Sequence, residues 1–295
     1  MSELDQFYEV VLELVKQGGS LEQICDKLMI DRKMKNVPFR NFQLIRENIS
    51  RQKNIQVKSC DVDLVTETDQ MVEKLLMDGI SAKFPDHKFI GEETTAQGHK
   101  VELTDAPTWI IDPVDGTMNF VHSMPHTCIS IALYVNKVAE IGIVYNPVIE
   151  QFFSARRGQG AFLNGAPIHV SGETELNKAL VMMELGTSRD PEKMRIVMEN
   201  LKTMTPLVHG TRALGSCALN MCMVAMGAAD VMYEFGIHVW DIAAGDLIVR
   251  EAGGTCIDPA GGDFDPLSRR ALCASSPELA QKVSGTLVQY YPERD

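Results

Sequence analysis

The chain has 295 residues, of which 45% are hydrophobic and 23% are charged, a composition that excludes disorder and is typical of a folded globular protein. No apolar run approaches the roughly 20 residues that span a bilayer, so we expect no membrane association. The formal net charge is −12, from 28 basic and 40 acidic side chains. Nucleic acid binds basic surfaces, so we do not expect it to be a partner of this acidic protein.

The first residues indicate a cytoplasmic protein that begins with a helix. Residues 1–5 are acidic and lack the basic region of a secretory signal. The seven cysteines form no CxxC pair, which favours free, reduced thiols over a disulfide framework. Apolar side chains at helical spacing predict a helix over residues 5–17, which ends at Gly18 and Gly19.

The middle of the chain changes from helix to strand. Residues 69–84 carry apolar side chains on one helical face and stop before Pro85. Short apolar runs bounded by turn residues follow, a pattern typical of antiparallel strands. Asn164-Gly165 is a strong signal for a type I′ hairpin turn. The predicted strands are residues 88–90, 108–111, 130–135, 140–145 and 151–154.

Beyond about residue 175, strands alternate with helices. Pro191 favours a helix start at this point, and Gly253-Gly254 is typical of a helix end. The predicted strands are residues 180–183 and 230–233, and the predicted helices are residues 190–204, 216–227 and 241–251.

The most informative motif is Asp-Pro-Val-Asp-Gly-Thr at residues 112–117. An apolar strand ends at Asp112, and Pro113 is expected to prevent its continuation. Ligands of layered α/β proteins gather beyond such strand ends. Asp112 and Asp115 would repel each other unless a proton or a cation lay between them. Divalent cations prefer carboxylate and carbonyl oxygens, so both aspartates and the Val114 carbonyl are candidate ligands.

Taken alone, this motif is explained better as a turn that caps a helix. Glu92, which follows the strand at residues 88–90, would alone be a surface charge, and Asp241 would alone be the cap of the helix at residues 241–251. All these carboxylates, however, lie where one element ends and another begins. Four carboxylates that met there would form a site for two or three Mg²⁺ ions.

Three segments together resemble the signatures of the inositol monophosphatase family, in the same order. They are Gly91-Glu92-Glu93, residues 112–120 and residues 240–254, and residues 62–69 match as well. The resemblance runs from about residue 57 onward, and the combination is specific although no single segment is.

The resemblance implies an α/β fold (α+β in some classifications) built as a layered αβαβα sandwich. It implies a single domain over residues 1–295, with an α+β half at about residues 1–175 and an α/β half at about residues 176–295. Residues 20–43 are extra relative to the family pattern, which predicts an insertion there. Because the neighbouring loop, ending near Lys58, covers a metal in the family, we hypothesise that the insertion alters the affinity for Mg²⁺.

The resemblance also implies a Mg²⁺-dependent, lithium-sensitive homodimer that hydrolyses myo-inositol monophosphates with metal-activated water. Galactose 1-phosphate and related sugar phosphates are further candidate substrates. The first metal would be held by Glu92, Asp112 and the Val114 carbonyl, the second by Asp112, Asp115 and Asp241, and a weaker third by Glu92.

The same resemblance assigns catalytic and substrate contacts. Thr117 would orient the attacking water, Asp69 would accept a hydrogen bond from the Thr117 hydroxyl, and Glu92 would complete the catalytic set. The expected substrate contacts are Glu92, Asp115, Gly116, Thr117, Thr187, Gly215, Ser216, Cys217, Glu234 and Asp241.

Two alternatives stay open. A bisphosphate nucleotidase-like phosphatase would need a basic pocket for the second phosphate, and the sequence shows no such pocket. A non-catalytic relative that binds a metal or a phosphosugar is disfavoured because Asp69, Thr117 and all four metal carboxylates are retained.

Overall fold

The computed structural model describes residues 4–8, 39–58 and 61–295, and of residues 39–43 the backbone alone. Most of the predicted helix at residues 5–17 and of the predicted insertion at residues 20–43 lies outside these ranges. The last residues of that insertion begin helix α3 (Phe39–Asn48). Within the described residues, no helix is long and apolar enough to cross a bilayer.

A seven-stranded sheet occupies the middle of the sequence, as the apolar runs predict. Its order is β3-β4-β5-β6-β7-β8-β9, with β3 and β4 parallel and every other neighbouring pair antiparallel. Both residues of the Asn164-Gly165 turn have positive φ (50° and 82°), as a type I′ hairpin requires. The strands are β3 (Lys88–Gly91), β4 (Thr108–Asp115), β5 (Cys128–Val135), β6 (Val138–Asn146), β7 (Gln151–Arg156), β8 (Ala161–Leu163) and β9 (Ala166–Ile168).

A second sheet of five strands follows, in the order β11-β10-β12-β14-β13. Strands β11, β10 and β12 are parallel neighbours, whereas β14 is antiparallel to both β12 and β13. The strands are β10 (Leu180–Met183), β11 (Gly210–Arg212), β12 (Val231–Phe235), β13 (Thr255–Ile257) and β14 (Arg270–Ala274). A short antiparallel pair, β1 (Ile55–Val57) and β2 (Leu64–Thr66), lies apart from both sheets.

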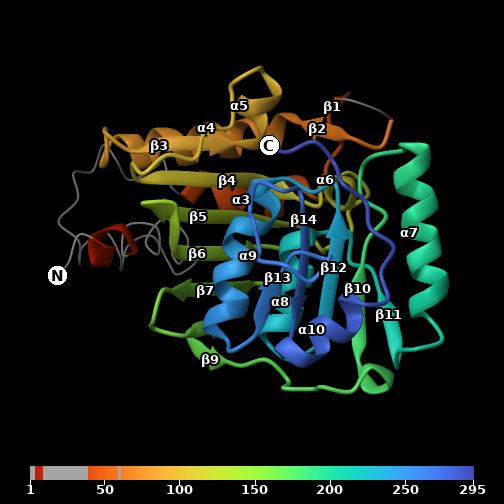
Figure 1. Cartoon of the computed structure of the whole chain (residues 1–295). Helices are drawn as coiled ribbons and strands as arrows, with labels where there is room; N and C mark the ends of the chain where they lie inside the picture. Colours follow the sequence, from red (N-terminus) through yellow and green to blue (C-terminus); the bar gives the residue numbers. More distant parts are fainter. Residues whose placement is uncertain (1–3, 9–38, 59–60) are drawn as a thin grey trace.

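Helices separate and cover the sheets in five layers (Figure 1). Helices α3 and α4 share one apolar cluster with the outer face of the seven-stranded sheet. Helices α8 and α9 lie between the two sheets in a second cluster, and α7 and α10 cover the far face of the five-stranded sheet in a third. The αβαβα arrangement is therefore confirmed. The helices are α4 (Glu67–Ser81), α5 (Glu92–Ala96), α6 (Thr117–Val121), α7 (Pro191–Met204), α8 (Cys217–Ala225), α9 (Val239–Glu251) and α10 (Pro277–Ser284).

Helix α9 packs against the seven-stranded sheet at very short range. A Cβ atom added to Gly142 of β6 would stand 2.7 Å from the Ala244 carbonyl oxygen of α9, so only glycine permits this approach. Near the start of the same helix, the Ser130 hydroxyl of β5 donates to the Trp240 carbonyl oxygen over 3.0 Å. These contacts fix the first turn of α9, which carries Asp241, over β5.

Two sequence-based expectations about element ends are wrong. Strand β4 does not stop at Pro113 but continues to Asp115. Strand β3 ends opposite Ile111, so no neighbour on that side needs the backbone N–H that Pro113 lacks. Helix α9 begins at Val239 with His238 as its N-cap, and Asp241 is the third helical residue rather than the cap.

Candidate active site

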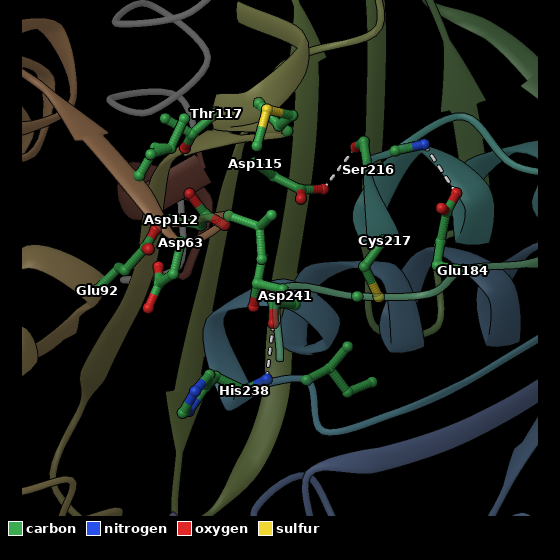
Figure 2. Close-up of a pocket in the computed structure, with 18 of the residues that line it drawn as sticks. Asp63, Glu92, Asp112, Asp115, Thr117, Glu184, Ser216, Cys217, His238 and Asp241 are labelled. Carbon is green, nitrogen blue, oxygen red and sulfur yellow. Dashed lines mark hydrogen bonds between the residues drawn. The ribbon is translucent and has the colours of Figure 1, made fainter. Parts of the chain in front are cut away.

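A cavity of about 760 Å³ lies where the C-terminal end of β4 meets the first turns of α8 and α9. Every residue assigned to the site from the sequence lines this cavity except Asp69. Figure 2 shows acidic side chains from β4, α5 and α9 gathered at one end, with Ser216, Cys217 and Glu184 at the other. The cavity therefore has a strongly acidic part and a mixed polar part.

A β-bulge brings Asp112 and Asp115 onto one face of β4. Asp112 is paired with Ser130 and Asp115 with Cys128, so the two residues between the aspartates face only one residue of β5. In a regular strand, residues three apart point to opposite faces, and the extra residue of the bulge restores the same side. The sequence motif contained both aspartates, but not this geometry.

The start of α8 holds the Asp115 carboxylate. Its Oδ2 atom accepts hydrogen bonds from the Ser216 hydroxyl at 2.6 Å and from the Ala218 backbone N–H at 2.7 Å. The other carboxylate oxygen of Asp115, Oδ1, takes no part in these two bonds and can contact another partner. Ser216 also caps α8 by accepting from the Leu219 N–H, so one side chain orders both the helix and the carboxylate.

Asp241 is held in a similar way at the start of α9. Its Oδ2 atom accepts from the His238 backbone N–H at 2.6 Å, the bond drawn in Figure 2. The Asp295 carboxylate accepts from the His238 ring at 2.6 Å and from the Val239 N–H at 2.8 Å. The first turn of α9 is therefore fixed by a residue that the sequence motifs did not suggest.

Asp112, Asp115 and Asp241 each offer one oxygen, and these three oxygens lie within 4.8 Å of one another. Burial, together with repulsion from neighbouring carboxylates, raises the pKa of Asp115 to about 7 and that of Asp241 to about 6. Burial and repulsion from Glu92, Asp115 and Asp241 hold the pKa of Asp112 well above its usual range. A hard cation with a preference for oxygen would relieve this repulsion, so the donor set fits Mg²⁺.

Glu92 lies at the edge of this cluster and makes an ion pair with Lys58. The Lys58 ammonium is 2.6 Å from an oxygen of Glu92 and 2.6 Å from an oxygen of Glu93. Burial lowers the pKa of Lys58, but attraction from the two glutamates outweighs burial and raises it overall. Burial and repulsion from Glu92 raise the pKa of Glu93 to about 8, although Lys58 acts in the opposite direction. Sequence reasoning did not identify the Lys58–Glu92 pair.

Thr117 and Asp69 are joined as the sequence led us to expect. The Thr117 hydroxyl lies 3.1 Å from Asp69 Oδ1 and 2.9 Å from the Val114 carbonyl oxygen. Asp69 also accepts from the Thr66 backbone N–H at 3.0 Å and from the Thr66 hydroxyl, which closes a capping box at the start of α4. Asp69 is fully buried behind Thr117, and burial raises its pKa to about 6 despite these donors.

The mixed polar part of the cavity is built by two chain turns and β12. Glu184 accepts from the Gly215 N–H at 2.7 Å and from the Asn220 amide at 2.9 Å. No sequence motif pointed to Glu184. Gly215 has a φ of 75°, and a Cβ there would meet the Asn119 amide at 2.8 Å, so the turn requires glycine. Glu234 is buried at the back of this part, and Thr187 lies at its exposed rim.

Comparison with known proteins decides the family of this site. A model of the inositol monophosphatase family matches residues 33–291. The chain belongs to the inositol monophosphatase family.

Relatives within the inositol monophosphatase family cover most of the chain. Inositol monophosphatase 1 of Bos taurus is 49% identical over 82% of this chain and 88% of its own length. Inositol monophosphatase 2 of Homo sapiens is 45% identical over 83% of this chain and 85% of its own. The solved structure of an IMPase from Thermotoga maritima superposes with a TM-score of 0.75, at 32% identity over 84% of this chain and 92% of that one.

Proposed function

We propose that the protein is a Mg²⁺-dependent phosphomonoesterase that hydrolyses myo-inositol monophosphates to inositol and phosphate. The observation that carries this proposal is the group of three aspartates, buried Asp112 and Asp115 and half-buried Asp241, beside a cavity large enough for a sugar-sized ligand. Family membership and the names of the relatives support the substrate class.

In this proposal the acidic part of the cavity holds the metal ions. Asp112, Asp115 and Asp241 would hold two of them, with Glu92 and the Val114 carbonyl completing the set, and Glu92 would serve a weaker third. Bound Mg²⁺ supplies positive charge against the phosphate and makes water a better nucleophile near neutral pH. Through these ions an acidic protein binds an anionic substrate.

Thr117 and Asp69 are proposed to orient the attacking water. The Thr117 hydroxyl donates its one proton to Asp69 or to the Val114 carbonyl, so its oxygen is left to accept a hydrogen bond from water. This contact would direct the water toward the phosphorus in line with the leaving oxygen. Asp69 keeps the Thr117 hydroxyl in this orientation, because Asp69 is itself fixed: its Oδ2 atom accepts hydrogen bonds from Thr66 in the α4 capping box, and its Oδ1 atom faces Thr117.

The mixed polar part of the cavity is proposed to bind the inositol ring. Glu234 would accept hydrogen bonds from ring hydroxyls, and the remaining assigned contacts would surround the ring and the phosphate. Carboxylates suit a polyol because they accept hydrogen bonds from its hydroxyl groups. These other contacts are Asp115, Gly116, Thr187, Gly215, Ser216 and Cys217.

Phosphate release tests the proposal. We expect release from inositol 1-phosphate with Mg²⁺ and none with EDTA. Galactose 1-phosphate and a 3′,5′-bisphosphorylated nucleotide are the comparison substrates, and a preference for the nucleotide would instead favour the nucleotidase alternative. No release from any of the three would contradict the enzyme assignment.

The family resemblance supports further properties that we propose with the activity. They are a homodimer, measurable by light scattering; inhibition by lithium, measurable in the same assay; and residence in the cytoplasm, measurable by fractionation. We also propose that residues 1–295 form a single domain that unfolds in one transition.

A further inference from the structure

Lys193 is a buried cation that the proposed chemistry does not use. It lies in the first turn of α7 and is 1% exposed. In the part of the chain that the structure describes, four buried side-chain polar atoms make no hydrogen bond, and Lys193 Nζ and Glu234 Oε2 are two of them. A buried ammonium without a partner costs stability, so its position calls for an explanation.

The ammonium lies directly behind the sugar side of the cavity. A Cβ atom on Gly186 would stand 2.5 Å from Lys193 Nζ and 3.5 Å from Glu234 Oε1. A Cβ atom on Gly236 would stand 2.9 Å from the same Nζ. Gly186, Gly236 and Glu234 all line the cavity, so the ammonium packs against both glycine turns and shares the space beside Gly186 with Glu234.

Charge connects the two side chains. Burial raises the pKa of Glu234 well above its usual range, and repulsion from Glu184, Asp241 and Asp115 adds to this, whereas Lys193 acts in the opposite direction. Burial lowers the pKa of Lys193, Arg269 and Arg189 lower it further, and Glu234 raises it. Lys193 is thus the cation that offsets the negative charge of Glu234, which three other acidic groups of the cavity repel.

We propose that Lys193 is a positioning residue for substrate selection, which holds Glu234 as an anionic acceptor for a hydroxyl group of the substrate. The proposal rests on the proposed phosphatase activity and deepens it. The substrate class it selects is a phosphate ester of a polyol, with hydroxyl groups remote from the phosphate.

The chemistry of Glu234 explains why the charge matters. An ionised carboxylate accepts hydrogen bonds from hydroxyl groups through both oxygens, and the unpartnered Oε2 atom of Glu234 offers such a position. A protonated Glu234 would be a weaker acceptor and would itself need an acceptor in an acidic surrounding. Lys193 does not line the cavity itself, so it acts through Glu234 and the two glycine turns.

Replacement by methionine is the sharpest test, because K193M removes the charge and keeps an unbranched chain. K193M leaves the buried Glu234 without the cation that offsets its charge, which destabilises a fold, so we expect a lower melting temperature in K193M than in K193M/E234Q. We expect KM for inositol 1-phosphate to rise about tenfold, the loss typical of one charged hydrogen bond, with kcat within about twofold. Phenyl phosphate, which has no ring hydroxyl, should show kcat/KM within about twofold of the wild type.

A double-mutant cycle separates an effect through Glu234 from a general loosening of the site. If Lys193 acts through Glu234, K193M in an E234Q background should change KM by less than about twofold, because the effects of coupled residues do not add. K202M is the matched control, since Lys202 is exposed on the same helix, and it should behave as the wild type.

Other results of these assays would contradict either the role of Lys193 or the proposed substrate. Equal losses for both esters, additive losses in the cycle, or an unchanged KM for inositol 1-phosphate would contradict the role of Lys193 while leaving the activity intact. A wild-type protein that hydrolyses phenyl phosphate but not inositol 1-phosphate would contradict the proposed substrate and this role together.

Discussion

Asp112 and Asp115 point to the same face of β4 because the strand bulges between them, where they pair with Ser130 and Cys128 of β5. The bulge makes the proximity of the two carboxylates a property of the sheet rather than of a flexible loop. The cost of bringing buried negative charges together is therefore met during folding, before any cation binds.

Asp112→Asn should abolish this metal site without unfolding the protein. Mutation of a residue that only supports a metal ligand typically lowers metal affinity or activity by roughly 10- to 100-fold. For a ligand itself we expect at least that loss in kcat/KM, and a loss of Mg²⁺ binding measured by calorimetry. The melting temperature without metal should not fall, since one buried negative charge is removed. Asp78→Asn on the exposed face of α4 is the matched control, and substantial turnover by Asp112→Asn would contradict the assignment.

Removing the metal should make stability depend on pH in a particular direction. The pKa values of Asp115 and Asp241 in the folded chain are about 7 and about 6, above the usual aspartate value near 4. Between these values the folded state binds more protons than the unfolded state, so the free energy of unfolding falls as pH rises from about 4 to about 7.

Thermal melts in EDTA check this dependence. We expect the melting temperature to fall as pH rises from about 5 to about 7.5, and saturating Mg²⁺ to reduce the fall. A melting temperature in EDTA that rises over the same range would show that the cluster is not proton-binding.

Thr117 should act through its hydroxyl and not through its methyl group. Misplacement of a reacting group by about 1 Å can cost roughly 100-fold, so we expect a loss of this order in kcat for Thr117→Ala with little change in KM. Thr117→Ser keeps the hydroxyl and should retain most of the activity. Equal losses in the two variants would mean that packing, and not the bond to Asp69, explains the effect.

We expect Lys58 to compete with a bound cation for Glu92. Its ammonium already neutralises this carboxylate. Lys58→Met removes a positive charge that repels Mg²⁺ and frees Glu92, so it should lower the Mg²⁺ concentration for half-maximal activity by about threefold or more. Lys74→Met, which breaks an exposed ion pair on α4, is the control. A higher Mg²⁺ requirement in Lys58→Met would instead indicate that Lys58 itself helps to bind the substrate.

Gly142→Ala should damage the site from outside it. The added methyl group would press on the Ala244 carbonyl and shift α9, which carries Asp241. Overpacking of this kind costs about 1–3 kcal/mol, so we expect a lower melting temperature and weaker Mg²⁺ binding. Gly262→Ala, which meets nothing within 4 Å, should change neither, and normal Mg²⁺ binding by Gly142→Ala would show that α9 is not fixed by this contact.

The sequence by itself determined which elements form and which carboxylates they carry. Periodic apolar side chains predicted β10 and α7 within one residue, and the hairpin at Asn164-Gly165 followed from local turn chemistry. The Thr117–Asp69 contact followed from a family resemblance. These features depend on the conformational preferences of residues close together in the sequence, or on short motifs that can be recognised in the sequence alone.

Only the tertiary structure decided how the carboxylates meet. Pro113 was expected to end a strand, but β3 stops before it and a bulge accommodates it. Asp241 was expected to cap α9, yet His238 takes that position and Asp295, 54 positions beyond Asp241 in the sequence, fixes the turn. Lys58, Glu184 and Lys193 reach the site through contacts between residues distant in sequence, and a local pattern carries no information about such contacts because burial and pairing depend on the whole fold.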